Sequence, residues 1–397
     1  MTSQEAGGST PANGSHRALL AYASIGSGHE QAVRALGEVF VRAGWEPVYL
    51  DFLDAVPSPM RYVIRESYLQ LIRFLPEAYD AAFKHSVGMT LHEAEAMSLL
   101  LSNIGYLHLR AVVRDLRPSA MVSTHLFPTM AMAKVHRHAT QQCLMVNCFT
   151  DYVLQPLYMS RGISWHTSAG EQVTAAFHTS HPRVRTPIHS LGIPVRPAFE
   201  VIHTKQEARA LLGLPQDVPA ILVMGGGLGL GHIVEVCDAL TSCPLRTPAT
   251  IVALCGTNAD VQEQVHRLAG ARASVCEVRA VGWTDQVPLW MQAADLLVSK
   301  AGGVTIAEAA SVGLPLLIYQ PLPGQENANA TFLIVHDAAV LAEGPEQLLQ
   351  AVDLLLFSPR GPEVARHLRQ LGLPHAAENI VQHILQDTHP VPPGESL

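Results

Sequence analysis

The sequence has few charged residues and no cluster of basic ones. Charged side chains make up 15% of the 397 residues, and the formal net charge is −8. Because proteins that bind nucleic acids carry basic patches that neutralise phosphates, this balance argues against nucleic acid as a partner. Hydrophobic residues make up 48% of the chain, which is enough to bury large cores. Length and composition together predict two globular domains.

The chain also lacks the patterns of disulfide-rich, metal-binding and membrane-spanning proteins. Its six cysteines form no CxxC pair and no closely spaced set with histidines, so we expect reduced, mostly buried thiols and no bound metal. No uninterrupted apolar run is long enough to span a bilayer, and the segment 1–16 has no signal-peptide core. We expect a cytoplasmic protein with flexible tails at 1–16 and 381–397, and any membrane contact to be peripheral.

The stretch 296–332 carries the most information. An apolar run at 295–299 predicts a buried strand, which ends at Lys300-Ala-Gly-Gly303. There the missing Cβ atoms of two glycines let backbone amides approach a ligand. Apolar residues at helical spacing from Val304 predict a helix that ends at Gly313, and the unpaired N–H groups of its first turn suit a diphosphate.

A second buried strand at 314–320 and a proline-rich turn at 321–327 follow this helix. We expect the turn to deliver Gln325, Glu326 and Asn329 to the carboxyl end of the strand, where open α/β sheets bind ligands. Glutamine offers a donor and an acceptor, and glutamate accepts from two hydroxyls. These side chains therefore fit a polyhydroxylated ligand.

Strand and helix patterns alternate over about the first 195 residues. A strand is expected at 17–23, a glycine turn at 24–29 and a helix with apolar residues from Ala32 to Phe40. This order predicts the opening of a doubly wound α/β sheet. Further strands are expected at 48–52, 120–123, 144–149 and 163–168.

The second half of the chain restarts the same alternation. The linker 190–199 contains Pro194 and Pro197, whose stiffness suits a hinge between domains. A strand at 220–224 then runs into 225–231, in which five glycines predict a backbone-lined wall of a site, although glycine runs also occur as plain turns. No Lys-Ser or Lys-Thr ending follows, so NTP hydrolysis is not expected. A last helix near 377–385 is expected to cross back onto the first domain.

These motifs resemble a known family, the GT-B glycosyltransferases that include monogalactosyldiacylglycerol synthases, processive diacylglycerol glucosyltransferases and the lipid II N-acetylglucosaminyltransferase. Their motif type, KPGG-T-x-x-E and then P-G-Q-E-x-x-N, appears here at 300–308 and 323–329, with Ala301 in place of the usual proline. The resemblance implies an α/β protein of the GT-B class, with two Rossmann-like doubly wound domains that face a cleft. Residues 17–195 would bind the acceptor and the membrane, and residues 196–380 the donor.

By this resemblance, the donor would be a UDP-sugar. Glu308 would hold the ribose hydroxyls, the Gly302-Gly303 turn the diphosphate, and Gln325 with Glu326 the hexose hydroxyls. The segment 281–283 would hold the uracil largely through its backbone, with its tryptophan packing rather than stacking. The expected donor-site residues are Gly226, Gly227, Gly229, Asn258, Gly282, Lys300, Gly302, Gly303, Val304, Thr305, Glu308, Gln325, Glu326 and Asn329.

Two residues of the first domain are the expected catalytic groups. His29 ends an S-x-G-x-G-H element, and the resemblance places it in the cleft, where a base, acceptor-orienting or head-group role stays open; a lone histidine at a helix start is otherwise usually solvated or capping. Asp151 matches the family's T-D element at the end of a strand and could take the acceptor proton or pair with His29, unless it only caps a turn. Relatives commonly carry a histidine where this chain has Gln155.

The stretch 60–87 combines an apolar and aromatic helical stripe with arginines to one side, and Pro76 interrupts it. Such a surface suits anionic lipid head groups, while a helix packed on its own domain is the ordinary alternative. The family has acceptor and membrane loops in this region. The residues expected to contact the acceptor or the membrane are Gly28, Arg61, Arg65 and Tyr68.

The sequence and its resemblance thus predict an inverting hexosyltransferase that moves galactose or glucose from a UDP-sugar to diacylglycerol or a glycosyl-diacylglycerol, peripheral on the anionic inner face of the cell membrane. No cofactor or metal is expected, because a helix terminus at Gly302-Gly303 can offset the charge of departing UDP. Three alternatives stay open: a polyprenyl-diphosphate or other lipid acceptor, a UDP-sugar epimerase, and a non-catalytic UDP-sugar sensor.

Overall fold

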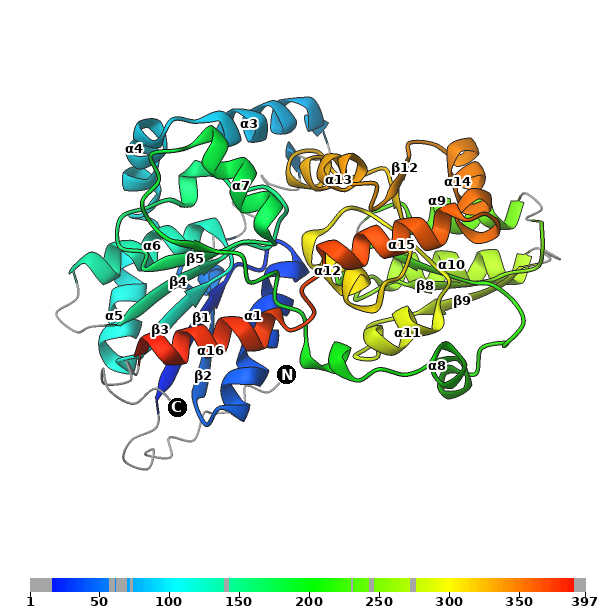
Figure 1. Cartoon of the computed structure of the whole chain (residues 1–397), viewed down its shortest axis with the longest axis horizontal. Coiled ribbons are helices and arrows are strands. Elements are labelled where there is room, and N and C mark those ends of the chain that lie inside the picture. The colour runs from blue at the N-terminus through cyan, green and yellow to red at the C-terminus, as the bar shows by residue number, and fades with distance from the viewer. Residues whose placement is uncertain are drawn as a thin grey trace.

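The computed structural model describes residues 16–56, 61, 70, 71, 74–138, 143–229, 231–242, 246–271 and 276–388, with the side chains of 270 and 271 excluded. Within these residues the chain forms two α/β domains that lie side by side (Figure 1). Arg65 and Tyr68, which were expected to contact the acceptor or the membrane, fall outside the described residues.

The N-terminal domain is built on a six-stranded parallel sheet with the strand order β2-β1-β3-β4-β5-β6. Its strands are β1 Arg17–Tyr22, β2 Glu46–Asp51, β3 Ala120–Ser123, β4 Leu144–Cys148, β5 Trp165–Thr167 and β6 Ile188–His189. Its helices are α1 Ser27–Arg42, α3 Pro76–Gly88, α4 Leu91–Leu101, α5 Tyr106–Leu116, α6 Leu126–His138 and α7 Glu171–Ser180, with short 3₁₀ turns at η1 Phe52–Ala55 and η2 Pro156–Tyr158.

The C-terminal domain repeats this plan with the strand order β12-β11-β10-β7-β8-β9, again all parallel. Its strands are β7 Ala220–Met224, β8 Thr250–Leu254, β9 Glu277–Val281, β10 Leu296–Ser299, β11 Leu316–Tyr319 and β12 Val340–Ala342. Its helices are α8 Lys205–Leu212, α9 Ile233–Ser242, α10 Ala259–Ala271, α11 Val287–Ala293, α12 Gly303–Val312, α13 Gln325–Val335, α14 Pro345–Phe357 and α15 Arg360–Leu371, after the linker turn η3 Pro197–Glu200.

Local sequence explains why the strands and helices of the C-terminal domain form where they do. Every residue of β7 and of β10 is buried, as expected for continuous apolar runs in a parallel sheet covered on both faces. Helix α12 ends where expected, because Gly313 adopts a left-handed conformation with φ of 66° that a side chain would oppose. The stretch 321–327 differs from the expected turn, since α13 already begins at Gln325.

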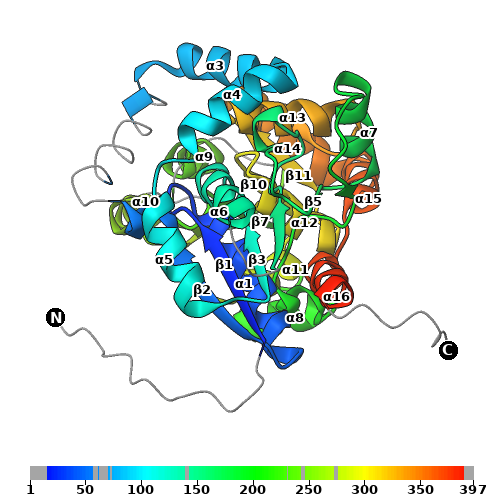
Figure 2. The ribbon, with the colours of Figure 1, turned by 90° about the vertical axis from the view of Figure 1, so that its left-hand side faces the viewer.

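The last helix, α16 Ala376–Thr388, returns to the N-terminal domain and lies beside α1 (Figure 2). Its buried residues Ala377, Ile380 and Ile384 pack into the same core as Leu36 of α1. The crossing back that the sequence predicted is therefore confirmed. The expected domain limit at 380 and flexible tail from 381 need correction, because the apolar stripe of this helix continues to 388.

The two domains share a hydrophobic contact beside the linker. Phe149 and Tyr152 of the N-terminal domain belong to one buried cluster with Ala301, Val304 and Ala330 of the C-terminal domain. Along the upper side of the molecule, α3 extends from α4 toward α13 (Figure 1). Contacts at these two places hold the domains face to face.

Candidate active site

The carboxyl ends of strands from both sheets open into one cavity of about 810 Å³. The loops after β1, β3 and β4 form its wall in the N-terminal domain, and those after β7, β8, β9, β10 and β11 form its wall in the C-terminal domain. Open parallel sheets bind ligands at this end, because the loops there present backbone and side-chain polar groups outside the packed strands. The cavity is the candidate active site.

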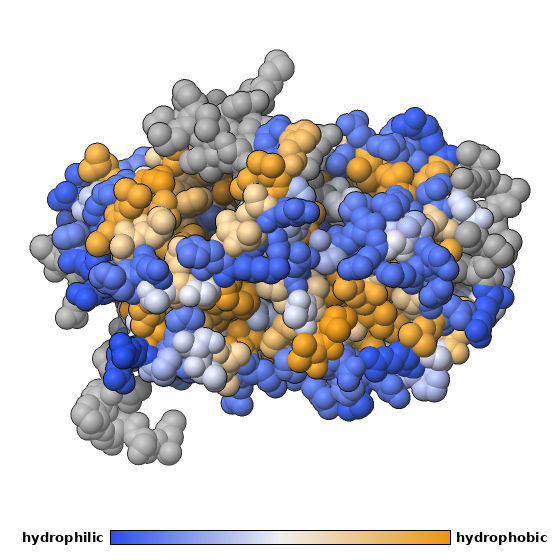
Figure 3. Space-filling view, turned by 90° about the horizontal axis from the view of Figure 1, so that it is seen from above, coloured by the Kyte–Doolittle hydropathy of each residue, from blue (hydrophilic) through white to orange (hydrophobic). Residues whose placement is uncertain are grey.

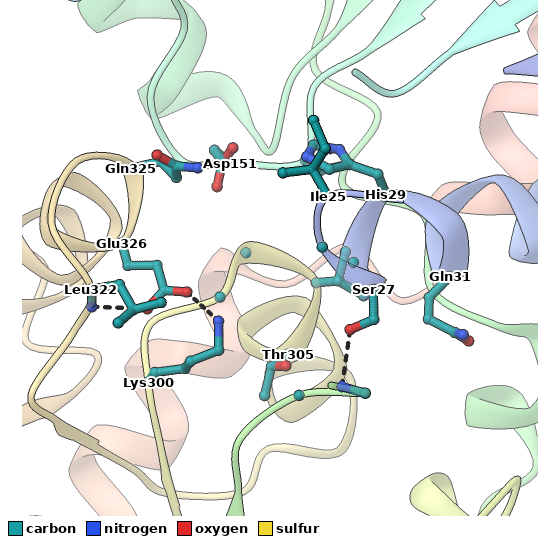
Figure 4. Close-up of a pocket in the computed structure, with 18 of the residues that line it drawn as sticks. Ile25, Ser27, His29, Gln31, Asp151, Lys300, Thr305, Leu322, Gln325 and Glu326 are labelled. Atoms are coloured by element: carbon teal, nitrogen blue, oxygen red, sulfur yellow. Dashed lines mark hydrogen bonds and ion pairs between the residues drawn. The ribbon is translucent and has the colours of Figure 1, made fainter. Parts of the chain in front are cut away.

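His29 lies in the first turn of α1 and lines the cavity (Figure 4). Its Nδ1 is 3.1 Å from the hydroxyl of Thr150, and its ring stands edge-on to His125 with the centroids 4.7 Å apart. Burial lowers the pKa of the His29 imidazole. The charge of the Asp151 carboxylate raises this pKa, but its effect is the smaller of the two. The ring is therefore neutral near pH 7 and can accept a proton.

Asp151 follows β4 and lines the same cavity. Its Oδ1 accepts a hydrogen bond of 2.9 Å from the side-chain amide of Asn329, in the other domain. Burial raises the pKa of the Asp151 carboxyl, while the bond from Asn329 lowers it. Asp151 and His29 are electrostatic neighbours, and the charge of each acts on the pKa of the other.

The start of α12 points into the cavity through residues 302–305. The N–H groups of a first helical turn have no partner within the helix and carry positive partial charge, as a diphosphate site requires. Gly303 has a further role, because a Cβ there would lie 1.9 Å from the backbone oxygen of Thr150. The absence of a side chain at Gly303 thus lets the backbone of the N-terminal domain pack against α12. A Cβ on Gly302 would have no atom within 3.4 Å.

The glycine-rich loop after β7 forms part of the wall through Gly226 and Gly227. The N–H of Gly227 donates a hydrogen bond of 2.9 Å to the hydroxyl of Ser27, which ties the loop to α1 (Figure 4). Gly229 and Asn258 do not line the cavity. Gly229 turns toward the loop after β8, and Asn258 caps α10 by accepting the N–H of Val261 at 3.1 Å.

Glu308 is buried in the second turn of α12 and lines the cavity. Burial raises the pKa of its carboxyl to about 7, although the charge of Arg196 acts in the opposite direction. Gly282 and Trp283 also line the cavity. The expectation that Trp283 packs holds in part, because its ring edge lies 3.1 Å from where a Cβ on Gly227 would be, while 53% of its surface is exposed.

The two residues expected to bind hexose hydroxyls both line the cavity at the start of α13. Glu326 pairs with the ammonium of Lys300, and its other oxygen accepts the N–H of Leu322 at 3.0 Å (Figure 4). Gln325 accepts a hydrogen bond of 2.7 Å from the hydroxyl of Tyr79 on α3. Asn329, expected beside them, is fully buried and does not line the cavity.

Of the residues expected to bind the acceptor or the membrane, Gly28 lines the cavity and Arg61 does not. Arg61 forms an ion pair of 2.8 Å with Asp54 instead. Gln155, where the family resemblance led us to expect a histidine, lines the cavity and accepts a bond of 3.3 Å from the hydroxyl of Ser86.

Sequence reasoning missed several residues of the cavity. His125 and Arg196 were not singled out, and Tyr79 was noted only as part of the helical stripe in 60–87. His125 follows β3, so the rule that ligands lie at strand ends could have found it. An apolar wall was also missed, because its members come from four separate segments. Its side chains are Ile25, Phe83, Leu126, Phe127, Leu157 and Tyr158.

Comparisons with known proteins agree with this architecture. Residues 29–195 match the family model of monogalactosyldiacylglycerol (MGDG) synthase, and residues 220–377 match that of the glycosyltransferase family 28 C-terminal domain. The processive diacylglycerol β-glucosyltransferases of Bacillus pumilus and Bacillus subtilis are 25% and 24% identical over 381 residues, which cover 95% of this chain and 96% of each relative.

Two solved structures show a similar fold at low identity. MurG of Acinetobacter baumannii superposes with a TM-score of 0.60 at 18% identity, over 94% of this chain and 99% of that one. UGT2 of Phytolacca americana, solved with UDP-2fluoro-glucose and pterostilbene, gives a TM-score of 0.57 at 12% identity, over 94% and 99% of the chains.

Fold and matched domains define the class of protein as a GT-B glycosyltransferase, which confirms the predicted fold and the expectation of an enzyme. Within this class, the first half of the chain matches the MGDG synthase model and the second half the family 28 C-terminal domain model, and the resemblance to the diacylglycerol glycosyltransferases is confirmed.

Proposed function

We propose that this enzyme transfers a hexose from a UDP-sugar to the free hydroxyl of diacylglycerol or a glycosyl-diacylglycerol, with inversion at the anomeric carbon. One observation carries the proposal: a single cavity joins the start of α12 and the glycine-rich loop to His29 and Asp151, and then to an apolar wall. A nucleotide-sugar at the first end and a lipid at the other would meet at these two residues.

The donor end supplies groups suited to each part of a UDP-sugar. Glu308 would accept hydrogen bonds from the ribose hydroxyls, and the first turn of α12 would bind the diphosphate. Gln325 and Glu326 would contact the hexose, since both lie in the cavity wall beside Lys300. Trp283 is exposed at this end, where its ring offers a flat surface to the uracil.

The reaction needs a base at the acceptor hydroxyl. His29 is neutral because burial lowers its pKa, and Asp151 has one carboxylate oxygen that is not bonded to Asn329. Either group would take the hydroxyl proton as the acceptor oxygen bonds to the anomeric carbon and the bond to UDP breaks. Attack opposite the leaving group inverts that carbon.

The negative charge that develops on UDP would be stabilised by the start of α12, together with the ammonium of Lys300. We propose that this replaces a metal ion. In the described residues, the side chains Glu200, His375 and Glu378 could hold a cation, but they do not line the cavity. Activity that persists in excess chelator would support metal independence.

The enzyme would reach its lipid from the membrane surface. No single described helix is long and apolar enough to cross a membrane. Helices α4 and α5 reach the necessary length and apolar composition only together, as a pair bent by 79°. Leu100 and Leu107, at the facing ends of these helices, are 68% and 77% exposed. Figure 3, which views the side where α3 and α4 lie, shows hydrophobic residues among hydrophilic ones. We propose that this face lies on an anionic inner leaflet.

The names of relatives favour glucose or galactose as the sugar. The Bacillus relatives are named glucosyltransferases, whereas the family model that matches residues 29–195 is that of a galactolipid synthase. The two hexoses differ in the configuration of one hydroxyl, so the choice depends on how Gln325 and Glu326 meet that group.

The test is transfer of radiolabel from UDP-glucose or UDP-galactose to diacylglycerol in mixed micelles, read in the organic phase. Wild type would be compared with Asp151→Asn, His29→Asn and Glu308→Ala, with Glu263→Ala on the exposed side of α10 as a control. Lipid label from wild type and the control, with a loss of about hundredfold or more in Asp151→Asn, is the expected result.

Other outcomes would overturn the proposal and identify an alternative. Label on a polyprenyl diphosphate but not on diacylglycerol would identify a different acceptor. Interconversion of the donor sugar without lipid would identify an epimerase. Donor binding without any chemistry would identify a sensor, the alternative that Gln155 favours.

A further inference from the structure

Asn329 has an environment unlike that of a sugar-binding residue. It lies in the second turn of α13, none of its surface is exposed, and it is not part of the cavity wall. A ligand in the cavity therefore cannot reach its amide in this arrangement of the domains.

All the hydrogen-bonding groups of the Asn329 side chain are already used, and two of its partners lie in the other domain. Its Oδ1 accepts the backbone N–H of Tyr152 at 2.8 Å, and its Nδ2 donates to Oδ1 of Asp151 at 2.9 Å. Nδ2 also donates to the backbone oxygen of Ala301 at 3.0 Å. The amide thus connects the loop after β4 to the loop after β10.

The surroundings of this amide are tightly packed and largely apolar. The backbone of Thr150 touches Gly303 so closely that no Cβ would fit between them. The ring of Tyr152 lies 5.3 Å from that of Phe332, also on α13. Because hydrogen bonds are stronger where water is excluded, the bonds of Asn329 are well placed to fix the geometry of both loops.

We propose that Asn329 is a positioning residue, which holds the Asp151 carboxylate in its productive orientation only when the two domains are closed. This rests on the proposed function, in which Asp151 contacts the acceptor. With Oδ1 held by Asn329, the second oxygen is left for the acceptor hydroxyl. Opening of the cleft would carry α13 away and release the carboxylate. The Asp151 carboxylate would then have its productive orientation only when the domains are closed on a bound donor.

The first test does not depend on any acceptor. Hydrogen exchange of the Tyr152 amide would be followed in wild type and in Asn329→Ala, with and without UDP. We expect exchange about tenfold faster in the variant, since its acceptor is gone, and UDP to slow exchange in wild type only. Thr331→Ala is the matched control, because Thr331 is exposed on the same helix and its hydroxyl donates to the backbone oxygen of Asn327, within that helix, at 2.8 Å. Equal exchange in wild type and Asn329→Ala would overturn the proposal.

The second test uses Asn329→Asp, which keeps the acceptor for Tyr152 and replaces the donor to Asp151 by a second carboxylate. We expect Tyr152 to stay protected, kcat to fall by about tenfold or more, and the donor KM to change by less than about twofold. The acidic limb of the pH profile of kcat/KM should move to higher pH. The hydrogen bond from Asn329 lowers the pKa of the Asp151 carboxyl, so its loss raises that pKa.

These outcomes separate the two proposals. Unchanged kcat and an unchanged acidic limb in Asn329→Asp would show that Asn329 only packs the interface, and would overturn its positioning role. If wild type transfers no sugar to diacylglycerol, the proposed function fails, while hydrogen exchange at Tyr152 still decides whether Asn329 holds the domains together.

Discussion

The hydroxyl of Tyr79 donates a hydrogen bond of 2.7 Å to Oε1 of Gln325, across the cavity and between residues 246 positions apart. The same helix, α3, contacts the loop before α13 a second time, because the carboxylate of Asp80 accepts the N–H of Gly324 at 2.9 Å. A Cβ on Gly324 would lie 2.6 Å from the Tyr79 ring, so this glycine is needed for the contact. Helix α3 therefore closes the cavity over the expected hexose site.

Tyr79→Phe should lower kcat/KM for the UDP-sugar without unfolding the protein. The lost hydrogen bond frees Gln325, and a neutral hydrogen bond contributes about 0.5–1.5 kcal/mol, or about two- to tenfold in kcat/KM. Steady-state kinetics with the UDP-sugar measure this. Tyr49→Phe, on β2 and outside the cavity wall, is the control. Identical kinetics for Tyr79→Phe and wild type would contradict a role of α3 in donor binding.

Glu308 should make nucleoside binding depend on pH. Burial raises the pKa of this carboxyl to about 7, and only the carboxylate accepts hydrogen bonds from both ribose hydroxyls. Affinity for uridine, which has no phosphate to titrate, should therefore rise from pH 6 to pH 8 in wild type. It should be weak and independent of pH in Glu308→Gln. Calorimetric competition with UDP measures both, and a flat profile in wild type would exclude this role for Glu308.

Glu308→Gln should also stabilise the ligand-free protein at high pH. The folded state binds the Glu308 proton more tightly than the unfolded chain, whose pKa is near 4.5, so this group costs stability as the pH rises from about 4.5 to about 7. Above pH 7, Glu308→Gln should exceed wild type by up to about 3 kcal/mol, and at pH 4.5 the difference should vanish. Urea unfolding at both pH values tests this, with Glu263→Gln on the surface as the control.

Lys300 and Glu326 should depend on each other for stability. Their ion pair is largely buried, and removal of one partner leaves an uncompensated charge that costs about 3–5 kcal/mol. Lys300→Met and Glu326→Leu should each lower Tm, and the double variant should recover most of the loss because no lone charge remains. Activity should stay low in all three. A double variant that regains transferase activity would show that the pair is only structural.

The exposed leucines of α4 and α5 should contribute to membrane binding. Leu100→Ser with Leu107→Ser should reduce binding to vesicles that contain anionic lipid by about tenfold or more, since each leucine that enters the bilayer contributes on the order of 1 kcal/mol. Leu211→Ser is the matched control, because Leu211 is 65% exposed on α8 of the other domain. Equal vesicle binding by the double variant and wild type would place the membrane surface elsewhere.

The sequence by itself determined most of the strands and helices, and its resemblance to a known family indicated the class of the protein. The buried runs at β7 and β10, the glycine turn before α1 and the end of α12 at Gly313 follow from local spacing and backbone preference, which act over a few residues. The donor motif at 300–308 and the T-D element at Asp151 were found for the same reason, because strand ends can be recognised locally.

Only the tertiary structure decided which side chains face the cavity and which join the domains. Asn329 and Gln325 belong to one motif, yet the first is buried against Asp151 and the second faces the ligand site. Gly303 looked like a ligand-binding glycine, but its closest neighbour is Thr150 in the other domain. Such roles depend on how two separately folded sheets are oriented, and spacing along the chain does not encode contacts between residues 178 positions apart.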